Sequence, residues 1–300
     1  MKWKIVGQDM RRPLVRLALM VFCASLPVLE IRGADAAEAA NARSWQVAGA
    51  AYSGRSTDIS EHTADARALA FQPDGSRMYV VGRGTRNVVE YTLAKPWEVD
   101  SAEYARELQL AATAAHGLFL HPETGAHMYV LNRSEILQYE LAIPWEVDSA
   151  TLRKRKPLHC ENASLVRGHD IHFAPDGTRF YVEDRINQEV YQYRLSTPWD
   201  VATLAWENTL DISREQRAVR GIELHPEGSR MWLLDTARRE ILEYDLSEPW
   251  QVASASLEPT FDVSAQAINP RGLAWRCDGR AFYITCNSRQ RIFQYMIVPE

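Results

Sequence analysis

A pattern of thirteen or fourteen residues occurs five times in this chain. This repeat restricts the folds that the chain can adopt more than any other feature of the sequence. Each copy joins a short apolar run, a turn of the Pro-Asp-Gly type and an apolar pair ending in Tyr or Trp. The copies occupy residues 67–79, 116–129, 169–181, 220–232 and 271–283. Repeats with a period near fifty residues are typical of solenoids, propellers and other arrays in which each copy is one structural unit.

One copy shows which elements a unit contains. Leu69 and Phe71 alternate with small residues, which predicts a short strand, and a second strand is expected over 78–81. The turn between them carries a proline, which presets φ, and a glycine, which supplies a positive φ. Residues 87–93 predict a third strand, and a weaker fourth is expected near 103–110. Four short strands in each repeat predict a propeller blade.

The spacing of the turns supports five blades that close into a ring. Successive turn positions are separated by 49, 53, 51 and 51 residues, and they are Pro73, Pro122, Pro175, Pro226 and Cys277. The fifth copy stops after its third strand, whereas segment 44–60 matches segment 249–264 of the fourth unit. We therefore expect the N-terminal segment to supply the outer strand of the last blade, which removes exposed sheet edges. The expected fold is an all-β, five-bladed β-propeller over residues 44–300.

The first thirty-six residues have the pattern of an export signal. A basic stretch at 11–16 precedes an apolar run at 17–29, and 34–36 reads Ala-Asp-Ala, a small-residue cleavage site. The run is short for a membrane span and no second one follows, so we expect no span after signal removal. The arginines fit both the general secretory and the twin-arginine route. We expect a signal peptide at 1–36, a linker at 37–43 and a periplasmic or secreted protein.

The chain that follows the expected signal is acidic and poor in cysteine. It contains 28 Lys and Arg against 36 Asp and Glu, a net charge of −8. Binding to phosphate backbones needs a basic face, so nucleic acid is not expected as the main partner. Its cysteines are Cys160, Cys277 and Cys286, an odd number that does not predict a disulfide framework.

The segment from Leu69 to Val80 reads Leu-Ala-Phe-x-Pro-Asp-Gly-x-x-Met-Tyr-Val. This pattern resembles the repeats of bacterial YVTN/lactonase-like propellers, in the broad WD40-like group, and the resemblance covers nearly all of residues 44–300. It implies a propeller fold. Members of that group usually have seven blades and this chain has five copies, so no lactonase site residue is transferred to it.

Polar residues begin the strands that are expected to line the central channel. They are Arg67, His116, His169, Arg220 and Arg271. A cationic ring at one mouth of the channel would attract a small anionic ligand, such as a carboxylate or a phosphate. Alternatively, each side chain binds backbone carbonyls or an acid of the next blade and ties the ring together. The two interpretations are compatible.

The third copy departs from the others at three positions near the axis. Asp170 stands where the other copies have Ala or Gly, His172 follows on the same strand face, and Glu183 replaces an apolar residue or Thr. Such a cluster suits a divalent metal or general acid–base catalysis, and an internal salt-bridge network is the structural alternative. Further polar residues expected nearby for ligand binding are His116, His169, Asp184, Glu223 and Asp235.

A tryptophan recurs in every unit, and the positions are Trp45, Trp97, Trp145, Trp199 and Trp250. We expect these rings to pack over the turns, and five aromatic platforms for sugar, as in a lectin, are the alternative. The favoured function is an exported binding or interaction module for a small anionic ligand or a protein partner. The rival is a metal-dependent or acid–base hydrolase, lactonase or lyase, in which Arg220 or Arg271 binds the substrate carboxylate. The sequence predicts no certain cofactor and no metal type.

Overall fold

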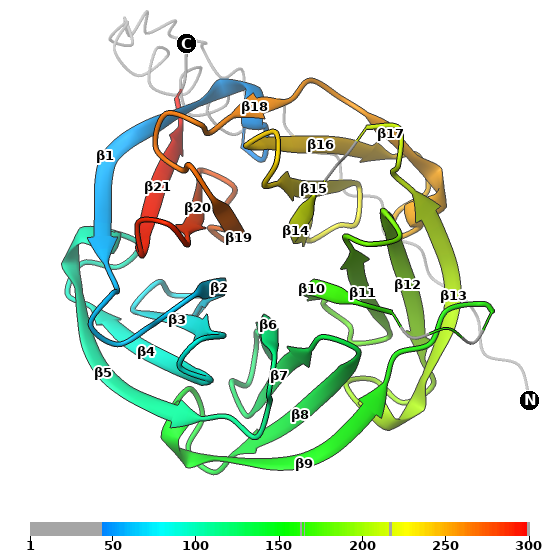
Figure 1. Ribbon diagram of the computed structural model, residues 1–300, viewed down its shortest axis with the longest axis horizontal. Helices are drawn as coiled ribbons and strands as arrows, with labels where there is room; N and C mark the ends of the chain where they lie inside the picture. Colours follow the sequence, from blue (N-terminus) through cyan, green and yellow to red (C-terminus); the bar gives the residue numbers. More distant parts are fainter. Residues whose placement is uncertain (1–43, 163, 165, 216–217, 299–300) are drawn as a thin grey trace, which may run out of the picture.

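Five antiparallel sheets surround a central axis in the computed structural model, which describes residues 44–298 except 163, 165, 216 and 217 (Figure 1). Each sheet is one blade, and one of its two end strands lies nearest the axis. The expected all-β, five-bladed propeller is confirmed. The expected signal peptide at 1–36 and linker at 37–43 lie outside the described residues.

In blades one to three, the strands run in chain order from the axis to the rim. Blade one consists of β2 (Ala66–Phe71), β3 (Arg77–Gly82), β4 (Asn87–Leu93) and β5 (Ala102–Gln109). Blade two consists of β6 (Ala115–Leu120), β7 (His127–Asn132), β8 (Glu135–Leu141) and β9 (Ala150–Pro157). Blade three consists of β10 (Gly168–Phe173), β11 (Arg179–Asp184), β12 (Glu189–Leu195) and β13 (Leu204–Asp211).

Blade four has an interrupted outer strand. It consists of β14 (Val219–Leu224), β15 (Arg230–Asp235), β16 (Glu240–Leu246), β17 (Ala255–Leu257) and β18 (Phe261–Asp262). Both β17 and β18 pair with β16. Pro259 lies between them and has no N–H to donate to the ladder, which explains the break.

Blade five is completed by the N-terminal segment. It consists of β19 (Pro270–Trp275), β20 (Ala281–Cys286), β21 (Arg291–Ile297) and β1 (Ala50–Asp58). β1 pairs antiparallel with β21, from Ala50 opposite Ile297 to Asp58 opposite Arg291. The predicted closure of the ring is therefore confirmed, and β1 pairs with the edge of β21 that would otherwise be exposed.

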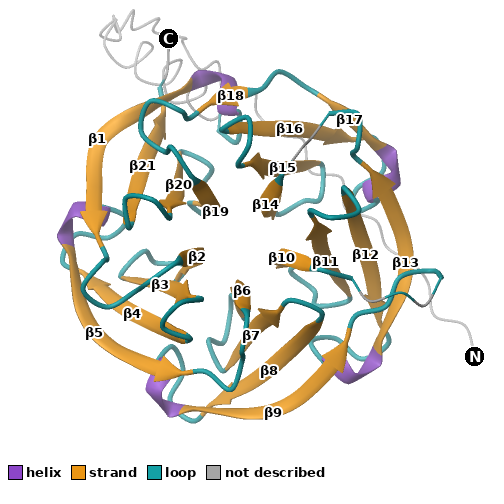
Figure 2. Cartoon of the chain, in the orientation of Figure 1, coloured by secondary structure: helices purple, strands orange, loops and turns teal. Residues whose placement is uncertain are grey.

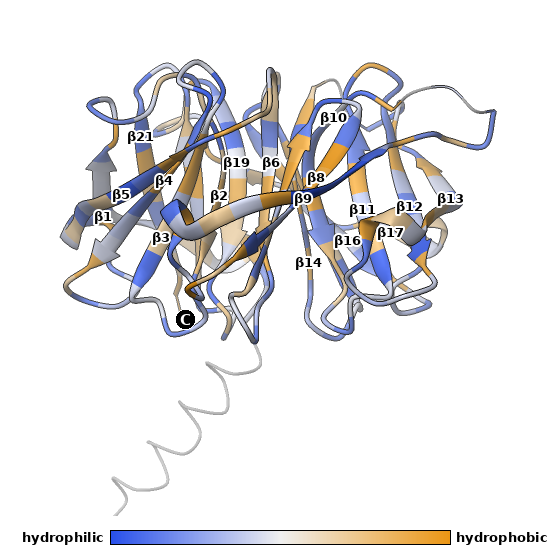
Figure 3. Ribbon diagram, turned by 90° about the horizontal axis from the view of Figure 1, so that it is seen from below, coloured by the Kyte–Doolittle hydropathy of each residue, from blue (hydrophilic) through white to orange (hydrophobic). Residues whose placement is uncertain are grey.

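The burial of the strands explains their sequences. The second and third strands of each blade are packed between neighbouring blades, so β3 and β11 are buried along nearly their whole length. β3 is apolar after Arg77, whereas β11 ends in two buried acids, Glu183 and Asp184. The outer strand covers only one face, and β9 accordingly alternates between half-buried and exposed residues. Figure 3 shows β9 crossing the flank of the ring with hydrophilic residues along much of its length.

A single 3-10 turn precedes each outer strand, and Figure 2 shows these turns spaced around the rim. They are η1 (Val47–Gly49), η2 (Val99–Ser101), η3 (Val147–Ser149), η4 (Val201–Thr203) and η5 (Val252–Ser254). The residue two positions before each turn is the repeated tryptophan, with φ between 64° and 69°. A positive φ costs energy in so large a residue, so packing must hold it there.

Each tryptophan ring covers the turn glycine of its own blade. A Cβ placed on Gly75 would overlap the indole of Trp97, and the Trp97 amide donates to the Gly75 carbonyl at 3.0 Å. The same overlap occurs at Gly125, Gly177, Gly228 and Gly279. The glycine is therefore needed both for its positive φ and for its missing side chain. This packing supports the expected role of the tryptophans in covering the turns.

Hydrogen bonds from the second strand tie each blade to the next one. The Tyr79 hydroxyl donates to the Trp145 carbonyl at 2.9 Å, and Tyr283 donates to Trp97 across the closing seam at 2.9 Å. Tyr129 and Tyr181 make the same bond to Trp199 and Trp250. In blade four Trp232 takes the tyrosine position, and the neighbouring Arg230 guanidinium donates to the Trp45 carbonyl instead, at 3.2 Å.

Candidate functional site

A β-bulge at the start of every inner strand places the predicted ring residues around the axis. In blade one the register shifts between Ala66 and Leu69, so two residues of β2 oppose one of β3. The same shift occurs in β6, β10, β14 and β19. A bulge re-aims side chains, and here it contains the ring residue and the one after it. The ring residues Arg67, His116, His169, Arg220 and Arg271 thus share one end of the axis, which we call the arginine end.

The side chain of Arg67 is buried, those of Arg220 and Arg271 are half-buried, and their guanidinium groups have few partners. Arg67 is 6% exposed, and its Nη2 bonds Asp65 at 2.7 Å. Its Nε and Nη1 have no hydrogen-bond partner within the described residues, and the same holds for Nε and Nη1 of Arg271 and Nε of Arg220. Asp65 also accepts from Arg83 and Asn287, at 2.6 and 2.7 Å. One carboxylate therefore serves several donors.

The mutual repulsion of these cations shows in their pKa values. Burial, and then the positive charges of Arg185 and Arg67, lower the pKa of Arg220 to about 10. Burial, followed by the charges of Arg220 and Arg67, lowers the pKa of Arg271 to about 9. All three ring arginines remain cationic at neutral pH. Because burial and like charge both disfavour the cations, an anion placed among them would be strongly stabilised.

The two histidines of the ring are polar but uncharged. Their rings meet edge to face, with centroids 4.8 Å apart. Burial and neighbouring positive charge lower the pKa of His116 to about 3 and that of His169 to about 2. The arginines alone therefore carry the positive charge of the ring at neutral pH, and the imidazoles contribute hydrogen-bonding groups beside them.

Asp170 and Glu183 form a buried acid pair beneath the arginine end. An Asp170 carboxylate oxygen accepts the Ile171 amide at 2.9 Å, and the amides of Leu118 and Ile222 lower its pKa, so inner strands of three blades meet at this group. Neither oxygen of Glu183 has a hydrogen bond of ordinary geometry within the described residues. Burial raises the pKa of both acids well above their usual values, and the charge of Asp170 raises that of Glu183 further.

His172 belongs to a different pair from the buried acids. Its Nδ1 lies 3.2 Å from Glu223 Oε2, and its ring meets the Phe119 ring edge to face, with centroids 5.5 Å apart. Glu183 instead lies near His169, whose Nδ1 is 3.9 Å from its Oε2. The three predicted catalytic residues are thus divided: Asp170 interacts with Glu183, whereas His172 pairs with Glu223. Among the described residues, no group of three or more His, Cys, Asp and Glu side chains is placed to hold a metal ion.

Asp184 and Asp235 organise turns after the second strand. Asp184 accepts backbone amides of Arg167 and Ile186, at 2.8 and 2.7 Å. Asp235 accepts the amides of Ala237 and Arg238, at 2.7 and 3.1 Å. These bonds occupy the carboxylates that were expected to bind ligand, and they indicate that both residues stabilise the fold.

The backbones of the inner strands touch just inside the arginine end. A Cβ on Gly117 would lie 3.0 Å from the Asp170 Cα, and one on Gly272 would overlap the Arg67 carbonyl. The small residues of this position, which the sequence repeats as Ala or Gly, are therefore required by blade contact.

The opposite end of the axis contains a cavity of about 420 Å³, which we call the aromatic cavity. It is lined by residues from all five blades, including the ends of the inner strands and the five turns. Its aromatic lining residues are Trp45, Phe71, Trp97, Phe119, Phe173 and Trp275. The sequence contains a signal for this cavity, an aromatic residue at the end of inner strands, but the same pattern is equally typical of core residues.

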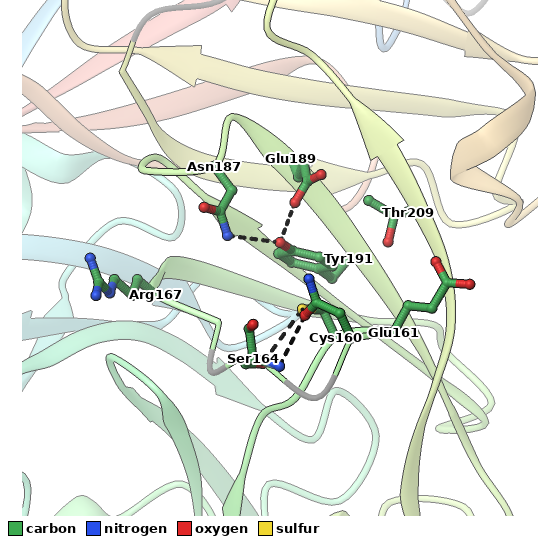
Figure 4. A pocket seen from close by; sticks show the side chains of 9 residues that line it. Cys160, Glu161, Ser164, Arg167, Asn187, Glu189, Tyr191 and Thr209 are labelled. Atoms are coloured by element: carbon green, nitrogen blue, oxygen red, sulfur yellow. Dashed lines mark hydrogen bonds between the residues drawn. The ribbon is translucent and has the colours of Figure 1, made fainter.

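A further pocket of about 690 Å³ lies on blade three, between β12, β13 and the loop after β9 (Figure 4). Tyr191 bonds Glu189 and accepts from Asn187 at 3.0 Å, and the Cys160 thiol donates to Asn162 Oδ1 at 3.0 Å. None of the predicted site residues lines it. Residues 163 and 165 of the same loop are outside the described part of the chain, so we assign no ligand to this pocket.

Two further observations concern the cysteines and the helices. Cys160, Cys277 and Cys286 are free thiols in the described structure. Within the same residues, no helix is long and apolar enough to cross a membrane.

No protein family matches this chain, and no curated protein is similar to it in sequence. The β-propeller domain of Cps50 (Swd1) from Myceliophteria thermophila is 9% identical and covers 83% of this chain and 100% of that domain, with a TM-score of 0.50. A Bacteroides uniformis protein provisionally assigned as a 6-phosphogluconolactonase is 14% identical and covers 76% of this chain and 65% of its own, with a TM-score of 0.48. A Lactobacillus plantarum protein is 11% identical, with 73% and 64% covered and a TM-score of 0.48.

These similarities concern the fold. The chain spans slightly less than two thirds of the length of the Bacteroides and Lactobacillus proteins, at 65% and 64%. The Cps50 (Swd1) domain shares the β-propeller architecture, and many unrelated functions use that architecture. Function must therefore be argued from the site.

Proposed function

We propose that this protein is a β-propeller binding module that recognises a small anionic ligand at the arginine end. The observation that carries the proposal is the set of buried guanidinium N–H groups of Arg67, Arg220 and Arg271 that have no partner in the described residues. An unpaired buried donor, and above all a charged one, is costly, so such groups are usually satisfied by a partner.

A carboxylate or a phosphate fits this set of donors best. Guanidinium groups bind both anions through paired, charge-assisted hydrogen bonds, and several arginines around one axis present them convergently. The uncharged imidazoles of His116 and His169 add hydrogen-bonding capacity without further repulsion. The Asp65 carboxylate forms an ion pair with Arg67. An anionic ligand would supply further negative charge and hydrogen-bond acceptors to the ring arginines.

The rival functions have less support. The hydrolase, lactonase or lyase hypothesis needs Asp170, His172 and Glu183 to act together, whereas the His172 imidazole is paired with Glu223. The lectin hypothesis needs exposed platforms, whereas the repeated tryptophans cover the turn glycines. We also propose that the protein acts in the periplasm or outside the cell, on the support of the export-signal pattern at 1–36.

Isothermal titration calorimetry with inorganic phosphate and with succinate, at low ionic strength, tests the proposed function. We expect binding by the wild-type protein and an affinity lower by about tenfold in Arg271→Gln, because one guanidinium contact is lost. Arg280→Gln is the matched control, since Arg280 is exposed in a turn at the other end of the blade. Failure of the wild-type protein to bind either anion, or equal affinities for the Arg271 variant and the wild type, would contradict the proposal.

A further inference from the structure

The aromatic cavity has the size and walls of a small-molecule site. Its volume of about 420 Å³ lies within the range of roughly 300–1,000 Å³ that is usual for ligand pockets. Phe71 and Trp97 come from blade one, Phe119 from blade two, Phe173 from blade three and Trp275 from blade five. Aromatic faces therefore surround the cavity from most directions.

The charges in this cavity have the opposite sign to those at the arginine end. Among the described residues neither Lys nor Arg lines it, whereas Glu123 and Glu223 do. The Glu223 side chain is 20% exposed, and it pairs with His172 at 3.2 Å. Blade four is the only repeat with an acid at this position, which the other copies fill with Ala, Phe or His. The cavity is thus an apolar space with a carboxylate in its wall.

An arginine beside the cavity shows how this end of the molecule accommodates a cation. The Arg276 guanidinium lies 5.6 Å from the centroid of the Trp97 ring, in cation–π geometry, and its charge is balanced by Asp278 at 3.1 Å. A cation inside the cavity would meet the same kind of aromatic surface with Glu223 as its counter-charge.

We propose that the aromatic cavity is a second ligand site, which binds a small organic cation with an aromatic or other apolar body. The apolar body would fill the space between the rings, and the ammonium group would contact Glu223 and the aromatic faces. Burial of the body supplies affinity, and the carboxylate selects for positive charge. The site is distinct from the one in the proposed function, because none of the five ring residues of the arginine end lines the aromatic cavity.

The test compares a cation with a neutral molecule of nearly the same shape. Phenethylammonium and 2-phenylethanol are titrated into the protein in phosphate-free buffer, with calorimetry and tryptophan fluorescence as the measurements. We expect phenethylammonium to bind at least about tenfold more tightly than the alcohol. In Glu223→Gln, which keeps the shape of the side chain, the two affinities should become equal while binding of the alcohol persists.

Two control variants distinguish a local role of Glu223 from an effect of net charge and from binding at the arginine end. Glu103→Gln removes an exposed carboxylate from β5 and should change neither affinity, because the net charge alone does not set the preference. Arg271→Gln should leave phenethylammonium binding unchanged even if the anion site proves wrong. Absence of binding by both probes, equal binding of both by the wild type, or an unchanged preference in Glu223→Gln would overturn the proposal.

Discussion

The Glu243 carboxylate accepts a 3.0 Å hydrogen bond from the backbone amide of Val47, a residue 196 positions earlier in the chain. This bond ties the third strand of blade four to the N-terminal segment that completes blade five. An equivalent bond from a valine backbone amide to a side-chain oxygen joins each of the four remaining pairs of neighbouring blades. These bonds run from Val99 to Gln294, Val147 to Glu90, Val201 to Gln138 and Val252 to Gln192. A buried Glu or Gln in the third strand is therefore a fivefold link between blades.

We predict that Gln192→Leu lowers the free energy of unfolding by about 1–3 kcal/mol, because the buried Val252 amide loses its acceptor. Gln192 also donates to Glu207 and Gln251, at 2.8 and 3.1 Å. Urea denaturation followed by fluorescence measures the change. Gln109→Leu, on the exposed side of an outer strand, is the control and should change stability by less than about 0.5 kcal/mol. An equal effect of the two substitutions would show that the link contributes nothing.

A second prediction separates the two reasons for glycine in the turns. Gly75→Ala should be destabilising by more than about 2 kcal/mol, because it has a positive φ and its new Cβ overlaps the Trp97 ring. Gly54→Ala has a positive φ too, but its Cβ would meet no heavy atom within 4 Å, so a cost of about 1 kcal/mol is expected. Thermal unfolding of the two variants measures the difference, and similar melting temperatures would argue against the steric role of the tryptophan.

The repeat was sufficient to predict the blades, their number and the closing strand, because each depends on local pattern and internal matching. The links from Gln192 and Glu243 were missed, since a buried polar residue in a strand looks like a surface residue until its partner in the next blade is known. The bulge at Arg67 and Ala68 was missed for a similar reason, because register depends on the paired strand.

The candidate site was predicted in part. The two-residue repeat of side chains along a strand correctly placed Asp170 and His172 on one strand. It could not show that backbone amides of neighbouring blades would engage Asp170. The division of His172 and Glu183 between two pairs depends on three-dimensional distances that no spacing in the sequence contains.

The buried acid pair leads to a prediction about pH. Because burial raises the pKa of Glu183, the unfolded chain ionises before the folded protein as pH rises, so the stability contributed by this group is lost above its ordinary pKa. Glu183→Gln should therefore be more stable than the wild type at pH 8, by about 1–3 kcal/mol, with the difference vanishing near pH 4. Urea denaturation at a series of pH values measures it. A variant that is less stable than the wild type at pH 8 would show that the carboxylate has a stabilising partner.

The histidines of the ring lead to the opposite dependence. Burial and positive neighbours lower the pKa of His169 to about 2, so the unfolded chain binds a proton below pH 6.5 that the folded protein does not bind. Stability from this group is present above pH 6.5 and is lost as pH falls, by roughly 1.4 kcal/mol for each pH unit. His169→Gln should therefore lose less stability than the wild type between pH 6 and pH 4, as measured by chemical denaturation. Equal losses would mean that the folded protein protonates His169 in this range, as it would if the Glu183 carboxylate 3.9 Å away were ionised.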